Sequence, residues 1–358
     1  MSVRLHIGDR PVGADAPAYI VAEAGVNHQC DLDIAREMIE KAKAGGADAI
    51  KFQTYNADTL TTRWAPRYWE HPEPSGTQYA IYKDSDDFVR EDYEKLFEHA
   101  RRVGIQWLTT PFDLEAVEWL AEMGMAAYKI ASADITNFPL LRAAASKQVP
   151  IMISSGGSTL DELRAAVDEI RRVGNQQIIL LHCILCYPSP DDQMNLRCIP
   201  TLQREFPDVV IGLSDHSVPD PCVTIPTAAV ALGAKVIEKH FTLDTSWDGD
   251  DHYLSVDPPM LRTMVANIRK AEAALGSGEV RVLECERAAH DYARRSIVAA
   301  VDLPAGTVLG PEHLIMKRPG TGVSPTLVDP MVGRRMIRDV AEDQLVTWED
   351  VDGDPPGS

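Results

Sequence analysis

The sequence predicts an α/β fold: an eight-stranded (β/α)8 TIM barrel followed by a small β-rich C-terminal domain. A short apolar, β-rich run followed by a turn and an amphipathic helical stretch recurs through roughly 250 residues, the size of one such barrel. Polar residues end most of these runs, and the pattern stops near Gly278. A doubly wound open sheet is the alternative, but it usually carries a glycine-rich dinucleotide loop, which is absent here.

The strand-like runs share β-branched and aromatic residues and are bounded by turn residues. They are Ala18–Gly25, Asp48–Thr54, Ile105–Phe112, Ala127–Ser132, Pro150–Gly156, Ile178–Cys183, Val209–Asp215 and Lys235–Phe241. Helical stretches follow them, for example residues 31–46 and 158–174, where apolar residues recur at i, i+3 and i+4 and glycine ends the pattern.

Two segments depart from the repeat. Residues 4–13 resemble a small hairpin that plugs the bottom of the barrel, and residues 55–90 form a long insertion after the second strand. Loops of that length usually form lids or binding loops. We therefore expect a barrel domain at 1–278, a linker at 279–293, a β-rich domain at 294–351 and a disordered tail at 352–358.

The overall charge argues against nucleic acid as a partner. Acidic residues outnumber basic ones 54 to 35, a formal charge of −19, whereas phosphate backbones require a basic footprint. No apolar run is long enough to span a membrane, and the N-terminus lacks a signal peptide. The six scattered cysteines then indicate a reduced, cytoplasmic setting, and the Cys183-x-x-Cys186 spacing carries little weight as a redox or zinc pair.

Reactive groups of β/α barrels come from the carboxyl ends of the strands. Most of the predicted strands end in polar side chains, and packing alone does not explain so many of them. They are Glu23, Lys51, Gln53, Thr110, Lys129, Ser132, Asp134, Ser154, Ser155, Ser214, Asp215, His216 and His240.

Two strand-end lysines indicate a bound anion, because a buried ammonium group is costly without a negative partner. Lys51 and Lys129 would bind a phosphate or a carboxylate, with further donors from hydroxyls and from the turn at residues 153–157. The alternative is a pair of internal salt bridges with Glu23 and Asp134.

His216 and His240 end adjacent strands, within reach of one cation. Carboxylates nearby and no required thiolate favour Mn²⁺ or Mg²⁺ over structural zinc. The alternative is that one or both histidines act as general acids or belong to the core.

Together these motifs resemble the sialic acid synthase family. The motifs are AEAGVNH, KFQT, TTPFD, YKIASAD, ISSGG, YPSP, IGLSDH and the stretch LDTSWDGDDH, and KRPGTG at Lys317–Gly322 resembles the family's antifreeze-like (SAF) domain. The resemblance runs from about Arg4 to Val351. It implies condensation of phosphoenolpyruvate with an N-acetylated hexosamine, giving a nine-carbon 2-keto acid and phosphate, with a divalent metal as Lewis acid.

The resemblance also implies roles for individual residues. The implied metal ligands are His216 and His240. The implied catalytic set is Glu23, Lys129, Asp134, His216 and His240. The implied phosphoenolpyruvate pocket is Lys51, Thr110, Lys129, Ser132, Ser154 and Ser214, and the sugar-facing positions are Gln53, Asp134, Tyr187 and Asp251. Arg318 matches an arginine that family dimers insert into the partner's site, and Tyr292 matches an aromatic linker residue over the sugar, which implies a domain-swapped homodimer.

Two pairs of residues depart from the family pattern. Ile184 and Leu185 replace a threonine and a small polar residue, and Tyr253 and Leu254 are bulkier than is usual there. The acceptor is therefore open: N-acetylmannosamine, or a deoxy amino sugar leading to legionaminic or pseudaminic acid.

The sequence leaves two other functions to consider as alternatives. A synthase for a phosphorylated aldose would need an extra cationic site, for which Arg63 and Arg67 are candidates. An ice-binding role for the C-terminal domain is disfavoured, because ice-binding faces are flat and uncharged and this domain carries several basic residues: Lys317, Arg318, Arg334 and Arg335.

Overall fold

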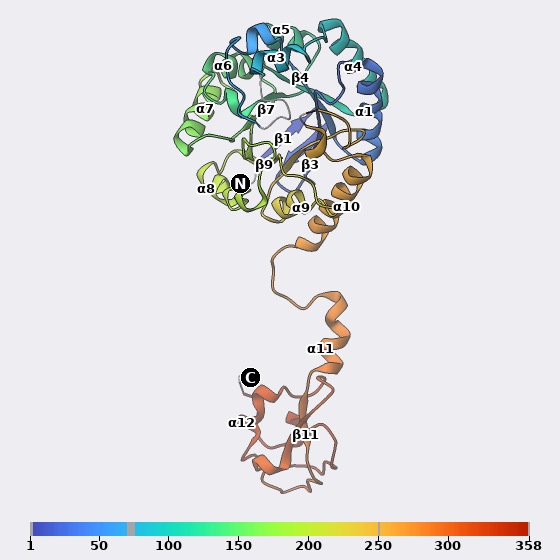
Figure 1. Cartoon of the computed structure of the whole chain (residues 1–358). Helices are drawn as coiled ribbons and strands as arrows, with labels where there is room; N and C mark the ends of the chain where they lie inside the picture. Colours follow the sequence, from blue (N-terminus) through green and yellow to red (C-terminus); the bar gives the residue numbers. More distant parts are fainter. Residues whose placement is uncertain (1–2, 70–75, 250, 357–358) are drawn as a thin grey trace. The chain divides into compact units, whose positions relative to one another are not determined.

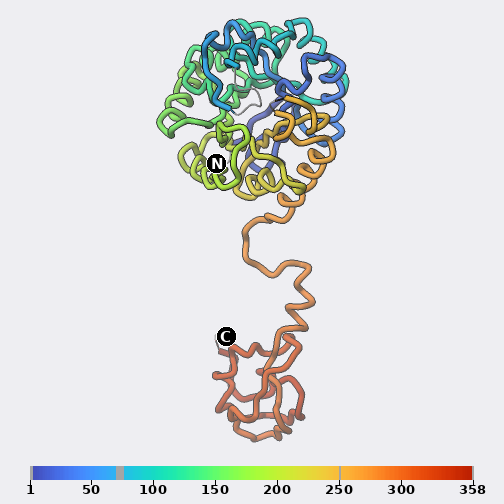
Figure 2. Tube along the Cα trace, in the orientation of Figure 1, coloured from blue at the N-terminus to red at the C-terminus, as the bar shows by residue number. Residues whose placement is uncertain are grey.

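The structure is a computed structural model that describes residues 3–69, 76–249 and 251–356. Two compact units follow one another along the chain, Met1–Gly276 and Ser277–Ser358, and the colours of Figure 2 trace their order. Among the described residues, no helix is both long and apolar enough to cross a membrane.

The first unit is a parallel β/α barrel (Figure 1), which confirms the predicted fold class. The hydrogen-bonded order is β5-β4-β3-β10-β9-β8-β7-β6, and β5 lies next to β6, so the sheet forms a nearly closed barrel. Each strand neighbours the next one in the chain, unlike in a doubly wound sheet. The strands are β3 (Tyr19–Gly25), β4 (Ala49–Thr54), β5 (Gln106–Pro111), β6 (Tyr128–Ile130), β7 (Ile151–Ser154), β8 (Ile178–Cys183), β9 (Val210–Asp215) and β10 (Val236–His240).

A helix follows each barrel strand and covers the outside of the sheet. Local signals set its ends: in the first helix the Asp31 side chain accepts from two backbone N–H groups, and Gly46 ends the helix with φ +90°. The helices are α1 (Leu32–Gly45), α4 (Arg90–Val103), α5 (Leu114–Glu122), α6 (Phe138–Ser146), α7 (Leu160–Arg172), α8 (Cys198–Glu205), α9 (Thr224–Ala231) and α10 (Pro258–Leu275).

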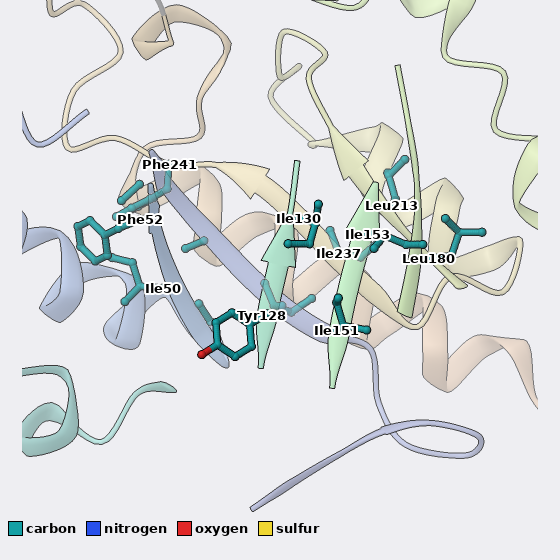
Figure 3. Close-up of a cluster of buried hydrophobic side chains, with 14 of the residues drawn as sticks. Ile50, Phe52, Tyr128, Ile130, Ile151, Ile153, Leu180, Leu213, Ile237 and Phe241 are labelled. Carbon is teal, nitrogen blue, oxygen red and sulfur yellow. The ribbon is translucent and has the colours of Figure 1, made fainter. Parts of the chain in front are cut away.

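The alternation of side chains along the strands creates two apolar layers. One lies between sheet and helices and includes Ile50, Tyr128 and Ile237, which Figure 3 shows on three different strands. The other fills the barrel interior and includes Val21 and Val236. A residue's layer therefore tells whether it faces the barrel interior or the helices.

A hairpin closes one end of the barrel. Strands β1 (Arg4–Ile7) and β2 (Arg10–Gly13) pair antiparallel, and Leu5, Ile7 and Val12 belong to the interior apolar layer. The hairpin predicted as a plug is confirmed in this position. The opposite end, where the strands finish, stays available for polar groups.

The insertion after β4 holds two short helices, α2 (Ala57–Leu60) and α3 (Gln78–Lys83). Residues 70–75, in the middle of the insertion, lie outside the described residues.

The second unit has its own small apolar core, which includes Ile297, Leu314 and Val346. Its strands β11 (Ser296–Ala299) and β12 (Leu314–Lys317) pair antiparallel, and its helix α12 (Val328–Met331) is short. The segment 279–293, which we expected to be a linker, contains the helix α11 (Arg287–Ala293). Arg334 donates to the backbone carbonyls of Asp352 and Asp354, so hydrogen bonds hold the first residues of the tail.

Candidate active site

The barrel interior changes from apolar to polar toward the strand ends. On β10, Val236 lies in the interior apolar layer, and Glu238 and His240 continue the same inward-facing row. The other strands repeat this change at Glu23, Lys51, Thr110, Lys129, Ser154, Cys183 and Ser214, all of which are buried.

The centre of this polar layer is an ionic network of two lysines and two glutamates. The Lys51 ammonium lies 2.7 Å from Glu23 Oε2 and 3.8 Å from Glu238 Oε2, and it donates to Thr110 Oγ1 at 3.0 Å. The Lys129 ammonium lies 3.3 Å from Glu238 Oε1. The network therefore joins four different strands across the barrel.

The sequence left a bound anion and internal salt bridges open for these lysines, and the structure contains salt bridges. Lys51 pairs with Glu23, as the salt-bridge alternative predicted. Lys129 pairs with Glu238 rather than with Asp134, whose carboxylate accepts from Asn137 Nδ2 at 3.0 Å. Asp134 lies on a short 3-10 turn just after β6, half-buried at the barrel mouth.

The pKa values of the two glutamates are shifted in opposite directions. Burial raises the pKa of Glu23, and the nearby charge of Glu238 adds to this against the opposing effect of Lys51. Burial also acts on Glu238, but Lys129, Lys51 and the hydroxyl of Ser214 outweigh it and lower its pKa to about 2. Two carboxyl groups whose environments separate their pKa values are suited to different roles, one as a proton carrier and one as a permanent charge.

Glu238 was missed in the sequence, although a signal for it was present. It lies two residues before His240 in a predicted strand, so strand alternation places both side chains on the same face. The Ser214 hydroxyl donates to Glu238 Oε1 at 2.7 Å, which fixes that carboxylate further.

Hydroxyl groups and a tight turn border the ionic network. Ser154 Oγ is buried and, among the described residues, has no hydrogen-bond partner. The Gly156 N–H donates to Ser132 Oγ at 3.1 Å, and a Cβ on Gly156 would lie 2.8 Å from that oxygen, so the turn requires glycine. Leu185, one of the departures from the family pattern, packs against the same turn.

His216 and His240 lie together at the mouth, with ring centroids 5.4 Å apart. His216 Nδ1 is 2.9 Å from the Ile184 carbonyl, which directs the other ring nitrogen away from the backbone. His240 Nδ1 is buried without a hydrogen bond among the described residues, and Asp251 Oδ2 lies 3.4 Å away. Burial and the His216 charge lower the pKa of His240, which keeps the ring in the neutral form that binds metals.

The two imidazole rings offer at most two nitrogen ligands to a cation. Within the part of the chain that the structure describes, no three or more His, Cys, Asp or Glu side chains are arranged to hold a metal ion by themselves. Two imidazoles plus a nearby carboxylate would leave positions for substrate and water, as catalytic sites require. Cys183 Sγ lies 3.8 Å from His216 Nδ1, and Cys186 is exposed, so the two cysteines do not form a pair.

Tyr187 and Gln53 complete the barrel side of the mouth. The Tyr187 ring stacks on His216 at 4.1 Å between centroids and meets His240 edge-on at 6.0 Å. Gln53 Nε2 donates to Glu23 Oε1 at 3.1 Å. The predicted sugar-facing positions Gln53, Tyr187 and Asp251 therefore gather around the ionic network and the histidines.

A ladder of aromatic rings connects the insertion to the barrel mouth. Phe112, directly after β5, meets Tyr55 at 5.9 Å, and Tyr55 meets Tyr82 of α3 at 5.4 Å. Tyr82 lies 5.9 Å from Trp69, which meets Tyr68 at 4.8 Å. The charges of Asp251 and Cys183 contribute to raising the pKa of Tyr68, after the larger effect of burial, so the ladder ends beside the site.

The remaining predicted residues belong to the second unit. Tyr292 is 66% exposed, and Arg318 is exposed at the end of β12. The site residues described above all belong to the first unit. Of the other departures, Leu254 is fully buried and Tyr253 is 44% exposed.

Fold and site define a β/α-barrel protein whose reactive groups gather at the carboxyl ends of the strands. The NeuB family profile matches residues 38–280, and a SAF domain profile matches residues 294–352. The N,N'-diacetyllegionaminic acid synthase of Legionella pneumophila is 40% identical, covering 96% of this chain and 98% of its own length. The human N-acetylneuraminate-9-phosphate synthase is 37% identical, and the match covers 96% of this chain and 95% of the human protein.

A solved structure agrees with this. The N-acetylneuraminic acid synthetase of Leptospira borgpetersenii, in complex with citrate, has a TM-score of 0.72 and 34% identity, covering 80% of this chain and 95% of its own. The chain belongs to the NeuB family and carries a SAF domain after its barrel. The family resemblance read from the motifs is confirmed.

Proposed function

We propose that this protein condenses phosphoenolpyruvate with an N-acetylated hexosamine, giving a nine-carbon 2-keto sugar acid and phosphate. The observation that carries the proposal is the buried network of Lys51, Lys129, Glu23 and Glu238 beside two histidines. The names of the Legionella and human relatives, both synthases of sugar acids of this kind, support it.

The lysines would bind the phosphate and carboxylate of phosphoenolpyruvate. Protonation of Glu23, which its raised pKa favours, leaves two ammonium groups against one ionised carboxylate, and such a pocket attracts an anion. The unpartnered hydroxyl of Ser154 would donate to the same substrate. The rest of the proposed phosphoenolpyruvate pocket is Thr110, Ser132 and Ser214.

The reaction forms one carbon–carbon bond and breaks one carbon–oxygen bond. C3 of phosphoenolpyruvate attacks the aldehyde carbon of the open-chain sugar, water adds at C2, and the tetrahedral intermediate loses phosphate by C–O cleavage. Glu23 would carry a proton near the new hydroxyl group, while the anionic Glu238 would stabilise positive charge developing at C2. Lys129 would stabilise the leaving phosphate.

A Mn²⁺ or Mg²⁺ ion held by His216 and His240 would polarise the aldehyde oxygen of the acceptor. Tyr187 packs the His216 ring and thereby keeps this side of the site rigid. Asp251 and Gln53 would orient the sugar hydroxyls, and Asp134 would contact the sugar from the loop after β6.

A phosphorylated acceptor is the second candidate, favoured by the name of the human relative. It would need free cations near the sugar. Arg63, however, is 3.7 Å from Asp58 and lies over the ring of Tyr79 at 5.4 Å, and Arg67, the other candidate, also interacts with other groups of the protein. We therefore propose an unphosphorylated acceptor.

The test is a screen of acceptors with phosphoenolpyruvate and Mn²⁺, read by phosphate release and product mass. N-acetylmannosamine, a di-N-acetylated deoxyhexosamine and a phosphorylated N-acetylmannosamine would be compared. We expect one of the unphosphorylated sugars to give a product whose mass is that of the sugar, phosphoenolpyruvate and one water together, less phosphoric acid. Turnover of the phosphorylated sugar alone would establish the second candidate, and no phosphate release with any of them would refute both.

A further inference from the structure

A buried ion pair lies directly behind the two histidines, on the outer face of the barrel sheet. Lys239 precedes His240 on β10, Asp215 precedes His216 at the end of β9, and the two are register partners in the parallel pairing of these strands. Their exposed fractions are 0% and 1%. Because side chains alternate along a strand, this pair faces the helices while Glu238 and His240 face the site.

The Lys239 ammonium contacts the main chain on both sides of His216. It lies 3.1 Å from Asp215 Oδ2, and it donates to the backbone carbonyls of Asp215 and Ser217. Asp215 Oδ1 accepts from the Ser217 N–H at 2.8 Å. One cation from β10 therefore fixes the turn that carries the histidine of β9.

A buried ion pair is a poor source of stability, because desolvation of both charges offsets their attraction. Apolar residues could fill this position between sheet and helices, as Ile237 does two residues earlier on the same strand. An apolar pair would not replace the hydrogen bonds of Lys239, which precedes His240, to the backbone carbonyls of Asp215 and Ser217, which flank His216. Groups behind a metal ligand typically orient it and tune its affinity.

We infer that Lys239 and Asp215 are positioning residues that hold His216 and His240 at the spacing needed to bind one divalent cation. The inference rests on the proposed function, since it takes the two histidines as the metal ligands. It assigns the pair no contact with substrate.

The test uses the full-length protein with Lys239→Met combined with Asp215→Asn. This double variant leaves no unpaired buried charge, and the asparagine still offers an acceptor to the Ser217 N–H. Mn²⁺ affinity is measured by the loss of the free-ion electron paramagnetic resonance signal. We expect affinity to fall about 10- to 100-fold, the Michaelis constant for phosphoenolpyruvate to change less than twofold, and high Mn²⁺ to restore most activity.

Asn175→Ala is the matched control for simple loss of stability. Asn175 is buried just before β8, at the far end of the barrel from the site, and donates to the carbonyls of Ala145 and Val149. It should lower the unfolding temperature without changing Mn²⁺ affinity.

Two outcomes would overturn the inference. If wild type binds Mn²⁺ and the double variant binds it within twofold, or if Asn175→Ala weakens binding equally, the pair does not position the histidines. If wild-type protein turns over substrate and binds no Mn²⁺, the metal role of the histidines fails and the inference fails with it. The first result leaves the proposed function intact, so the two failures are distinguishable.

Discussion

At the scale of single residues, Glu238 is the charge that links the two lysines of the site. Glu238→Gln keeps the length of the side chain and an acceptor for the Ser214 hydroxyl, but it removes the negative charge. We expect kcat to fall by roughly 10²- to 10³-fold, as when one fixed electrostatic contact to a transition state is lost. Phosphate release at saturating substrates measures this.

The matched control for Glu238→Gln is Glu118→Gln. Glu118 is an exposed carboxylate of α5 paired with Lys147 at 2.6 Å, away from the barrel interior. It should leave kcat unchanged. A kcat for Glu238→Gln within threefold of wild type would exclude an electrostatic role for Glu238.

His28 provides a prediction about stability. Its ring stacks on Phe88, and burial lowers its pKa from 6.5 to about 4. The unfolded chain therefore binds a proton that the folded chain refuses, so the stability present above pH 6.5 is lost as pH falls toward 4. The gap corresponds to about 3 kcal/mol in full, and to about 2 kcal/mol at pH 5.

Calorimetric unfolding at pH 7 and pH 5 tests the effect. His28→Gln should be less stable than wild type at pH 7, because the ring stack is lost, but it should lose less stability between the two pH values. If the variant loses as much stability as wild type between pH 7 and pH 5, another group causes the acid sensitivity.

At the scale of elements, we expect the insertion after β4 to recognise the acceptor sugar. Its aromatic ladder ends at Tyr68, whose pKa the charge of Asp251 helps to raise. Tyr68→Ala should raise the Michaelis constant of the acceptor about tenfold, since a ring contact contributes roughly 1 kcal/mol beyond the area it buries. The Michaelis constant of phosphoenolpyruvate, which we propose binds deeper in the barrel, should stay constant.

Trp64→Ala is the control within the same insertion, because Trp64 is 77% exposed. It should change neither Michaelis constant. Equal increases for both substrates in Tyr68→Ala would indicate general disturbance of the barrel mouth rather than recognition of the sugar.

Element boundaries show where local patterns stop being sufficient. The run Ala127–Ser132 predicts one strand, whereas β6 covers only Tyr128–Ile130 and Ser132 begins a 3-10 turn. The run Pro150–Gly156 likewise shortens to β7. The two segment ends lie in loops that a hydrogen bond from the Gly156 N–H to Ser132 Oγ connects. No local pattern contains that contact.

At the scale of the whole molecule, we propose that Arg318 acts in the site of a partner subunit. Arg318→Ala subunits mixed with Lys129→Ala subunits should then regain activity, because one of the two sites in a mixed dimer keeps both residues. Phosphate release from isolated mixed dimers measures the recovery. Lys51→Ala mixed with Lys129→Ala is the control, since both residues lie in the barrel and no site keeps both. Inactive mixed Arg318→Ala dimers would place Arg318 in its own subunit's site, and full activity of unmixed Arg318→Ala protein would place it outside any site.

The sequence by itself determined the barrel, the plug, the β-rich second unit and the strand ends that carry the site. These features depend on side-chain alternation, helical periodicity and turn residues, all of which act over short stretches of chain. The inward row of lysines, serines and histidines followed from the same alternation.

Only the tertiary structure decided which of these groups are partners. Lys129 pairs with Glu238 of β10 instead of the nearby Asp134, and Lys239 turns outward to Asp215. These partners lie on strands separated by many residues in the chain, and barrel closure and strand register bring them together. Charges in a buried site pair by distance and desolvation, so the separation of the two glutamate pKa values follows from the closed barrel.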